Sequence, residues 1–108
     1  MKLAFIIGYG ASAIGLLSRL LAEEAAEHGF DYLVVSDKAC LEHTDFIRDS
    51  DAILVYSSGL PGEVEKAVRH GRAKLVLALS VPCAHLARGS PDVISRAWAF
   101  YKTGGEKN

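Results

Sequence analysis

The sequence is constrained most by four short apolar segments that alternate with stretches of helical spacing. The first, KLAFIIG (2–8), is apolar without interruption, which is typical of a strand buried on both faces. The other three segments are DYLVVS (31–36), DAILVYSS (51–58) and AKLVLALSV (73–81). We therefore predict a doubly wound α/β fold, with a parallel sheet of four strands in the order 2-1-3-4 and helices on both faces.

The segments between the strands carry helix start and stop signals. We expect Ser12 to cap a first helix that ends near Gly29, and Thr44 to cap a short second helix. Pro61 is expected in the first turn of a third helix, and Ser90 at the start of the last one. The apolar residues of that last helix share one face: Val93, Ile94, Ala97, Trp98 and Tyr101. These elements predict a single domain over 1–103, with 104–108 as a tail or the start of a following segment.

Length, charge and cysteine content limit the classes of function. A chain of 108 residues supports one small domain with one core. Its formal net charge of −1 argues against a nucleic-acid partner, which usually requires a basic face. A membrane span is not expected, because no run of about 18 apolar residues occurs. The apolar run 3–7 is too short for a signal peptide, and two cysteines without such a signal favour a cytoplasmic setting.

A ligand site is expected where the strand order reverses, beyond the carboxyl ends of the first and third strands. Two loops meet there, GYGAS (8–12) and SSGLPG (57–62). Each leads into a helix N-terminus, where free backbone N–H groups can hold an anion. The candidate ligand- or anion-binding residues are Gly8, Gly10, Ser12, Asp37, Ser57, Ser58 and Gly59.

The glycine loop has two interpretations. Gly8-x-Gly10-x-x-Ala13 matches the looser dinucleotide fingerprint, and Asp37 ends the second strand, where a ribose-binding carboxylate would lie. However, Asp37 follows Gly8 by 29 residues, whereas the usual spacing is about 20. We therefore favour a tight strand-to-helix turn, with a nucleotide or flavin site as the alternative. A phosphorylated receiver domain is rejected, because its aspartate would stand where this chain has Ser57.

A metal site and a catalytic cysteine are both disfavoured. Cys40, His43, Cys83 and His85 have the ligand types of a zinc site. They follow the two edge strands of the predicted sheet, roughly 14 Å apart, which is too far for one metal ion or for a disulfide. Cys83 with His85 lacks an evident third group to orient the pair. No catalytic or metal-ligating residue is predicted.

The second half of the chain resembles a known family. SPDVISRAWAFYKTGGEKN (90–108) is similar to a segment of the large subunit of cobaltochelatase and of its relative, the porphyrin-binding subunit of magnesium chelatase. FIRDSDAILVYSSG (46–59) also looks like that family's short helix and third strand. The matching residues near the end are Trp98, Tyr101, Gly104, Gly105 and Asn108. In the family this element leads into a long subunit body, so the chain is expected to be an N-terminal domain or a stand-alone relative.

The resemblance implies a role in metal insertion. The family inserts a metal ion into a tetrapyrrole, and ATP is hydrolysed by separate partner subunits. The tetrapyrrole and metal site is expected in the body, so cobalt or magnesium and ATP are implied for the whole complex and no cofactor for this chain. We interpret the chain as a non-catalytic docking or assembly module of a chelatase in cobalamin biosynthesis, with the chelatase body or other subunits as partners.

Two other functions stay open. One is a small nucleotide- or flavin-binding protein that uses the glycine loop and Asp37. The other is a homodimeric structural protein without a ligand. The candidate interface residues are Trp98, Phe100 and Tyr101. Trp98 and Tyr101 share the apolar face of the last helix, whereas Phe100 falls off that face and could cover a neighbouring domain or a second copy.

Overall fold

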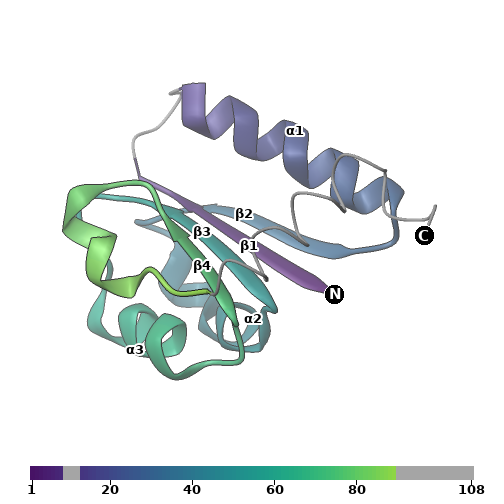
Figure 1. The fold of residues 1–108 in the computed structure, drawn as a ribbon. Helices are drawn as coiled ribbons and strands as arrows, with labels where there is room; N and C mark the ends of the chain where they lie inside the picture. Colours follow the sequence, from purple (N-terminus) through teal and green to yellow (C-terminus); the bar gives the residue numbers. More distant parts are fainter. Residues whose placement is uncertain (9–12, 90–108) are drawn as a thin grey trace.

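The computed structural model of the protein describes residues 1–8 and 13–89 (Figure 1). Its centre is a four-stranded sheet in which every pair of neighbouring strands is parallel. The strand order is β2-β1-β3-β4, which confirms the predicted topology. The strands are β1 (Lys2–Ile7), β2 (Asp31–Ser36), β3 (Ala52–Tyr56) and β4 (Leu75–Ala78).

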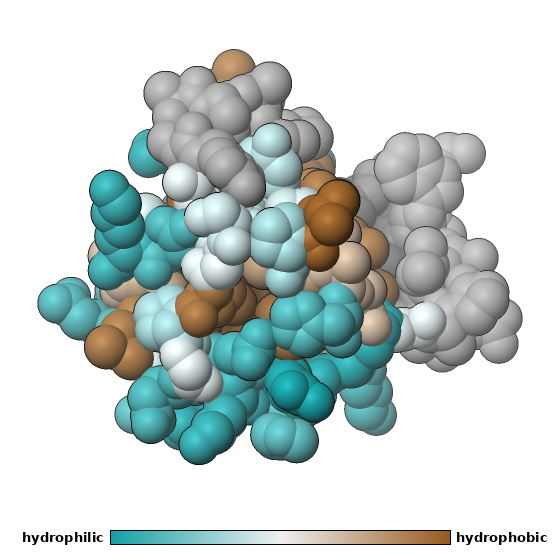
Figure 2. Space-filling view, turned by 90° about the vertical axis from the view of Figure 1, so that its left-hand side faces the viewer, coloured by the Kyte–Doolittle hydropathy of each residue, from teal (hydrophilic) through white to brown (hydrophobic). Residues whose placement is uncertain are grey.

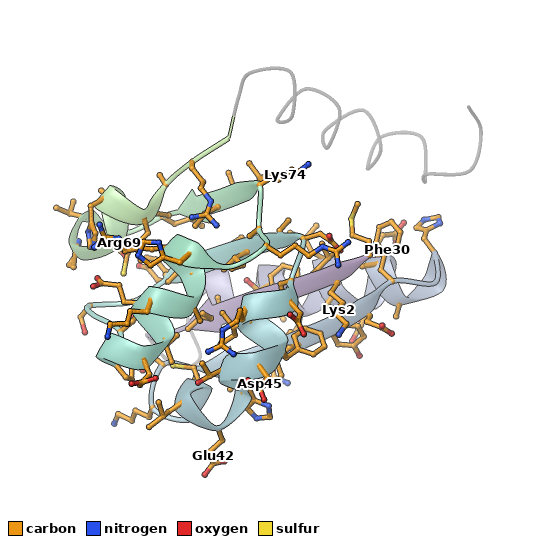
Figure 3. The ribbon with its side chains drawn as sticks, turned by 90° about the horizontal axis from the view of Figure 1, so that it is seen from below. Lys2, Phe30, Glu42, Asp45, Arg69 and Lys74 are labelled. Atoms are coloured by element: carbon orange, nitrogen blue, oxygen red, sulfur yellow. The ribbon has the colours of Figure 1, made fainter. Side chains whose placement is uncertain are left out.

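Helices cover both faces of the sheet, as the doubly wound prediction requires. α1 (Ala13–Glu27) packs on one face, against β1 and β2. α2 (Thr44–Asp49) and α3 (Gly62–His70) pack against each other on the opposite face, which Figure 3 views from below. Two 3₁₀ helices, η1 (Cys40–His43) and η2 (Val81–Leu86), follow the two edge strands. No helix in the described part of the chain is long and apolar enough to cross a bilayer.

The central strand β1 is buried on both faces, as its uninterrupted apolar sequence predicts. Ala4 and Ile6 belong to the core under α2 and α3. Leu3, Phe5 and Ile7 belong to the second core, which includes alanines of α1. All five side chains are buried, so the sheet is stable only when both layers of helices are present.

Two helix boundaries differ from the prediction. His43, not Thr44, is the N-cap of α2, because η1 runs directly into this helix and the Thr44 hydroxyl donates instead to the Leu41 carbonyl at 2.6 Å. Pro61 is the N-cap of α3 rather than a residue of its first turn. Ser12 and the helix expected from Ser90 lie outside the described residues.

Other boundaries follow from local chemistry. α1 ends at Glu27, and Gly29 takes the left-handed conformation with φ of 79°, as predicted for a residue that stops a helix. β4 is shorter than expected. The chain turns into η2 from Val81, where Pro82 has no N–H to continue a strand ladder.

Asp51 joins β1, β3 and the segment before β4 at the amino edge of the sheet. Its carboxylate accepts the backbone N–H of Lys2 at 2.9 Å and lies 3.1 Å from the Arg72 guanidinium. Its carbonyl accepts the N–H of Lys74 at 3.2 Å. The Lys2 ammonium, at this edge in Figure 3, lies 5.3 Å from the centre of the Phe46 ring. Asp51 therefore stabilises the amino edge of the sheet, opposite to the edge where a ligand site is expected. This position agrees with its place at the start of the predicted third strand.

Gly71 allows α2 to approach the end of α3 closely. The Arg48 carbonyl of α2 accepts the N–H of Arg72 at 2.8 Å. A Cβ at position 71 would overlap the Ala67 carbonyl oxygen and lie 2.8 Å from the Arg48 carbonyl oxygen. Both obstacles are backbone atoms, so a larger residue requires the two helices to move apart.

We expect Gly71→Ala to lower the free energy of unfolding by about 1–3 kcal/mol, the usual cost of overpacking. Gly62→Ala is the matched control, because a Cβ there meets open space at the start of α3. This control should leave stability unchanged or raise it slightly. Urea unfolding of the two variants measures the difference, and equal midpoints would contradict the steric argument.

Candidate functional site at the carboxyl edge of the sheet

The candidate site lies at the carboxyl ends of β1 and β3, where the strand order reverses. Gly8 follows β1 and donates its N–H to the Tyr56 carbonyl at 2.6 Å, so the pairing of β1 with β3 continues to the end of both strands. Ser57 follows β3 and is fully buried. The two loops that the sequence brings together therefore begin side by side in the structure.

Asp37 reaches this point from the end of β2. Its carboxylate accepts a hydrogen bond from the Ser57 hydroxyl at 2.7 Å. The same hydroxyl accepts the N–H of Gly59 at 3.1 Å and lies 2.8 Å from the Gly59 carbonyl oxygen. Because a serine carries one hydroxyl proton, it can donate to the Asp37 carboxylate or to the Gly59 carbonyl, but to only one at a time. The sequence thus correctly grouped Gly8, Asp37, Ser57 and Gly59 in one place.

Gly8 leaves room for the Asp37 carboxyl group. A Cβ at position 8 would overlap that carboxyl group and lie 3.0 Å from the Cα of Ser57. The backbone at Gly8 is not in the left-handed region, so the requirement for glycine comes from close approach alone. The space that a ligand would use to approach this backbone is occupied by a side chain of the protein itself.

Ser80 is part of the site and was missed by the sequence argument. Its hydroxyl donates to the Ser57 carbonyl at 2.6 Å and accepts the Ser57 N–H at 3.1 Å. These two bonds continue the β3–β4 pairing, in which Val55 and Ala78 are register partners, by two positions. The sequence shows only that a serine follows each of these two neighbouring strands, and the register that pairs Ser80 with Ser57 comes from the structure.

The two cysteines lie beneath the site. The Cys40 thiol donates to the Asp37 carbonyl at 3.1 Å, and the Cys83 sulfur lies 3.5 Å from the Ser57 carbonyl oxygen. Both are buried and free. The sequence argument assigned them to opposite edges of the sheet, but η1 and η2 turn back toward the core and place each beside one member of the Asp37–Ser57 pair. Burial, and secondarily the charge of Asp37, raise the pKa of the Cys40 thiol.

The histidines make separate contacts. His85 lies 2.8 Å from the Glu65 carboxylate and ties η2 to α3 at the surface, while Cys83 contacts Ser57. His43 is exposed. Within residues 1–8 and 13–89, no group of three or more histidine, cysteine, aspartate or glutamate side chains could hold a metal ion.

The remaining candidates fall into two groups. Ser58 and Gly59 are exposed at the rim of the site. Gly10 and Ser12 of the glycine loop lie outside the described residues, and so do the candidate interface residues Trp98, Phe100 and Tyr101.

The chain matches no family model and has no significant match among curated proteins.

We expect Ser57→Ala to lower the free energy of unfolding by about 1–3 kcal/mol, because it removes a buried hydroxyl that bonds both the half-buried Asp37 carboxylate and the Gly59 N–H. Ser58→Ala is the matched control, since the neighbouring serine is exposed and should change stability by less than about 0.5 kcal/mol. Urea unfolding tests the pair. Equal effects would mean that the hydroxyl of Ser57 has no structural role.

The raised pKa of Cys40 predicts a pH-dependent stability. In the unfolded chain the pKa of the thiol is near its ordinary value of 9.0, while burial raises this pKa in the folded protein, so the thiol keeps its proton to a higher pH. The folded state then binds more protons, so stability is full below about pH 9 and falls as the pH rises further. The free energy of unfolding of the wild type minus that of Cys40→Ala should therefore decrease from neutral pH to about pH 10. A constant difference would contradict the raised pKa.

Proposed function

We propose that this chain is a docking module of a metal chelatase, which binds the body of a large chelatase subunit and carries out no chemistry itself. The observation that carries the proposal is the occupied space over Gly8. The Asp37 carboxylate lies there and is hydrogen-bonded to Ser57, whose backbone is bonded in turn to Ser80. A site whose polar groups satisfy one another fits a structural role better than an open cofactor pocket.

Apolar side chains around this edge support a protein partner. Val81, the first residue of η2, is 89% exposed. Leu41, in η1, is 51% exposed. Figure 2, which faces the side of the molecule where η2 lies, shows hydrophobic surface among hydrophilic groups. Exposed apolar groups with a polar rim are typical of protein interaction surfaces.

The identity of the partner comes from the resemblance of the segments 46–59 and 90–108 to chelatase large subunits. In such a complex the tetrapyrrole and the cobalt or magnesium ion would bind to the body, and separate subunits would hydrolyse ATP. The module would contribute by holding the body in its assembled form, in the cytoplasm and within cobalamin biosynthesis.

The competing nucleotide- or flavin-binding function requires a different arrangement of the side chains at the site. A ribose or phosphate group could approach Gly8 only after the Asp37 carboxylate moves away from Ser57. We therefore expect separate titrations with NAD, ATP and FMN to leave the amide resonances of Gly8, Asp37 and Ser57 unshifted. Saturable shifts at these three residues would replace the docking function by a cofactor-binding one.

The docking function predicts binding in trans. The isolated chain should bind the body of a cobaltochelatase large subunit that lacks its own N-terminal domain, as measured by isothermal titration calorimetry. Val81→Asp should weaken this binding by roughly tenfold or more, because an exposed apolar anchor becomes charged. Leu20→Asp is the control, since Leu20 is 54% exposed on α1. A complete lack of binding by the wild-type chain, or equal effects of the two variants, would overturn the proposal.

A further inference from the structure

The outer edge of β2 is open in the described part of the chain. β2 is an edge strand, and among residues 1–8 and 13–89 it pairs only with β1. At the other edge of the sheet β4 is closed, because the Arg88 backbone bonds Val76 at 2.9 and 3.2 Å. Proteins commonly protect an edge strand with lysine, proline or a bulge, and β2, with the sequence DYLVVS and an unbroken register, has none of these.

The pairing with β1 determines which backbone groups of β2 point outward. The N–H of Asp31 donates to the Met1 carbonyl at 3.0 Å, so the backbone groups of Asp31 point toward β1. In a strand this direction alternates from one residue to the next. The N–H and carbonyl groups of Tyr32 and Val34 therefore point away from β1. Within the described residues these four groups are bonded to no other element.

Both ends of this open stretch are closed by the chain itself. At the amino end, the N–H of Phe30 donates to the Ala25 carbonyl at 3.1 Å. At the carboxyl end, the Ser36 carbonyl accepts the N–H of Ala39 at 3.2 Å. A strand that pairs with this edge is thus limited to the middle of β2.

We propose that two copies of the chain pair through their β2 edges, antiparallel and about a two-fold axis, so that the sheets join into one. In an antiparallel pair, residues whose backbone groups point outward lie opposite one another and exchange both hydrogen bonds. The register that uses the open groups sets Tyr32 of each copy opposite Val34 of the other, with the two Leu33 residues at the axis. Each outward N–H then meets a carbonyl of the second copy.

The side chains of β2 fit this register. Tyr32 and Val34 share the side of α1, where Val34 packs against the core and Tyr32 is 44% exposed. Each tyrosine ring then covers the valine of the other copy, and aromatic pairs with β-branched residues stabilise neighbouring strands. Asp31 lies opposite Val35. A shift of two residues toward the carboxyl end would instead set Asp31 opposite Asp37, which places two like charges together.

A second copy fits this edge because the pairing is self-complementary. Under two-fold symmetry both copies contribute the same donors, the same acceptors and the same side chains. Every group that is open at the edge of one copy meets an open group of the other. The inference does not rest on the docking function, which concerns Val81 of η2, at the β4 edge of the sheet.

The mass of the chain in solution tests the pairing. By analytical ultracentrifugation the wild type should have the mass of two chains, and dilution should shift it toward the mass of one. Tyr32→Pro should have the mass of one chain, since proline removes an outward N–H but none that bonds β1. Tyr32→Thr is the matched control, because it keeps the N–H and a strand-forming side chain, and it should dissociate less than Tyr32→Pro. Val81→Asp should leave the mass unchanged, although the docking function predicts that it weakens binding to the body.

A second measurement uses the wild type alone and does not depend on the folding of a variant. In this register the Hα atoms of the two Leu33 residues face each other across the axis, as in any pair that is not hydrogen-bonded. A nuclear Overhauser effect should therefore connect Leu33 of an isotope-labelled copy with Leu33 of an unlabelled one. A wild type with the mass of one chain at every concentration would overturn the proposal. A dimer without the Leu33 contact would do so too, because another surface would then join the copies. Neither result changes the expected binding to the chelatase body, so the two proposals fail independently.

Discussion

The structure depends on the burial of β1 on both faces. A strand with five consecutive buried side chains requires an apolar layer above and below it, and in a chain of 108 residues each helix has to provide a large share of one layer. α2 and α3 complete the layer on one side by packing against each other, and the core there includes Ile53, Val64 and Val76. On the other side α1 packs against β1 and β2, while Leu77 of β4 and Leu79 just after it are exposed.

The polar groups at the carboxyl edge follow from a second constraint, because buried hydrogen-bonding groups need partners. At the end of β3 the Ser57 backbone passes beyond the regular ladder, and the Ser80 hydroxyl bonds both its N–H and its carbonyl. The Ser57 hydroxyl then bonds Asp37, which brings the end of β2 to the centre of the sheet. Any ligand at this edge would have to replace these bonds as well as form its own, and this is the physical basis for preferring a docking role to cofactor binding.

The parts that the sequence predicts well are those with a strong periodic signal. Uninterrupted apolar segments located the strands, and residues 31–36 match β2 at both ends. The alternation of strands and helices led to the strand order, and the end of each strand led to the grouping of Gly8, Asp37 and Ser57. These conclusions need only the direction of each strand and the handedness of the crossovers.

The parts of the structure that the sequence predicts poorly are those that depend on short turns without periodicity. η1 and η2 have no repeating apolar pattern, so the inward paths of Cys40 and Cys83 could not be anticipated from the spacing of the strands. The error at Thr44 has the same origin, since a capping residue was assigned where a 3₁₀ turn already precedes the helix. Ser80 was missed because a single serine after a strand has many explanations. Its role depends on the register with Ser57, which a sequence without strand pairing does not contain.

Exposed apolar side chains lie on two sides of the chain near the end of β4, and the geometry of a strand separates them. Leu77 and Leu79 point to the side of α1 because they alternate with Val76 and Ala78, which face the other core. Val81 belongs to η2, where this alternation has ended, and its side chain is exposed at the edge of the sheet. Leu79 therefore lies on the α1 side of the sheet, whereas Val81 lies at the edge, where the proposed docking surface is. In the docking proposal, Val81→Asp is therefore expected to weaken binding to the body without changing the contacts on the α1 side of the sheet.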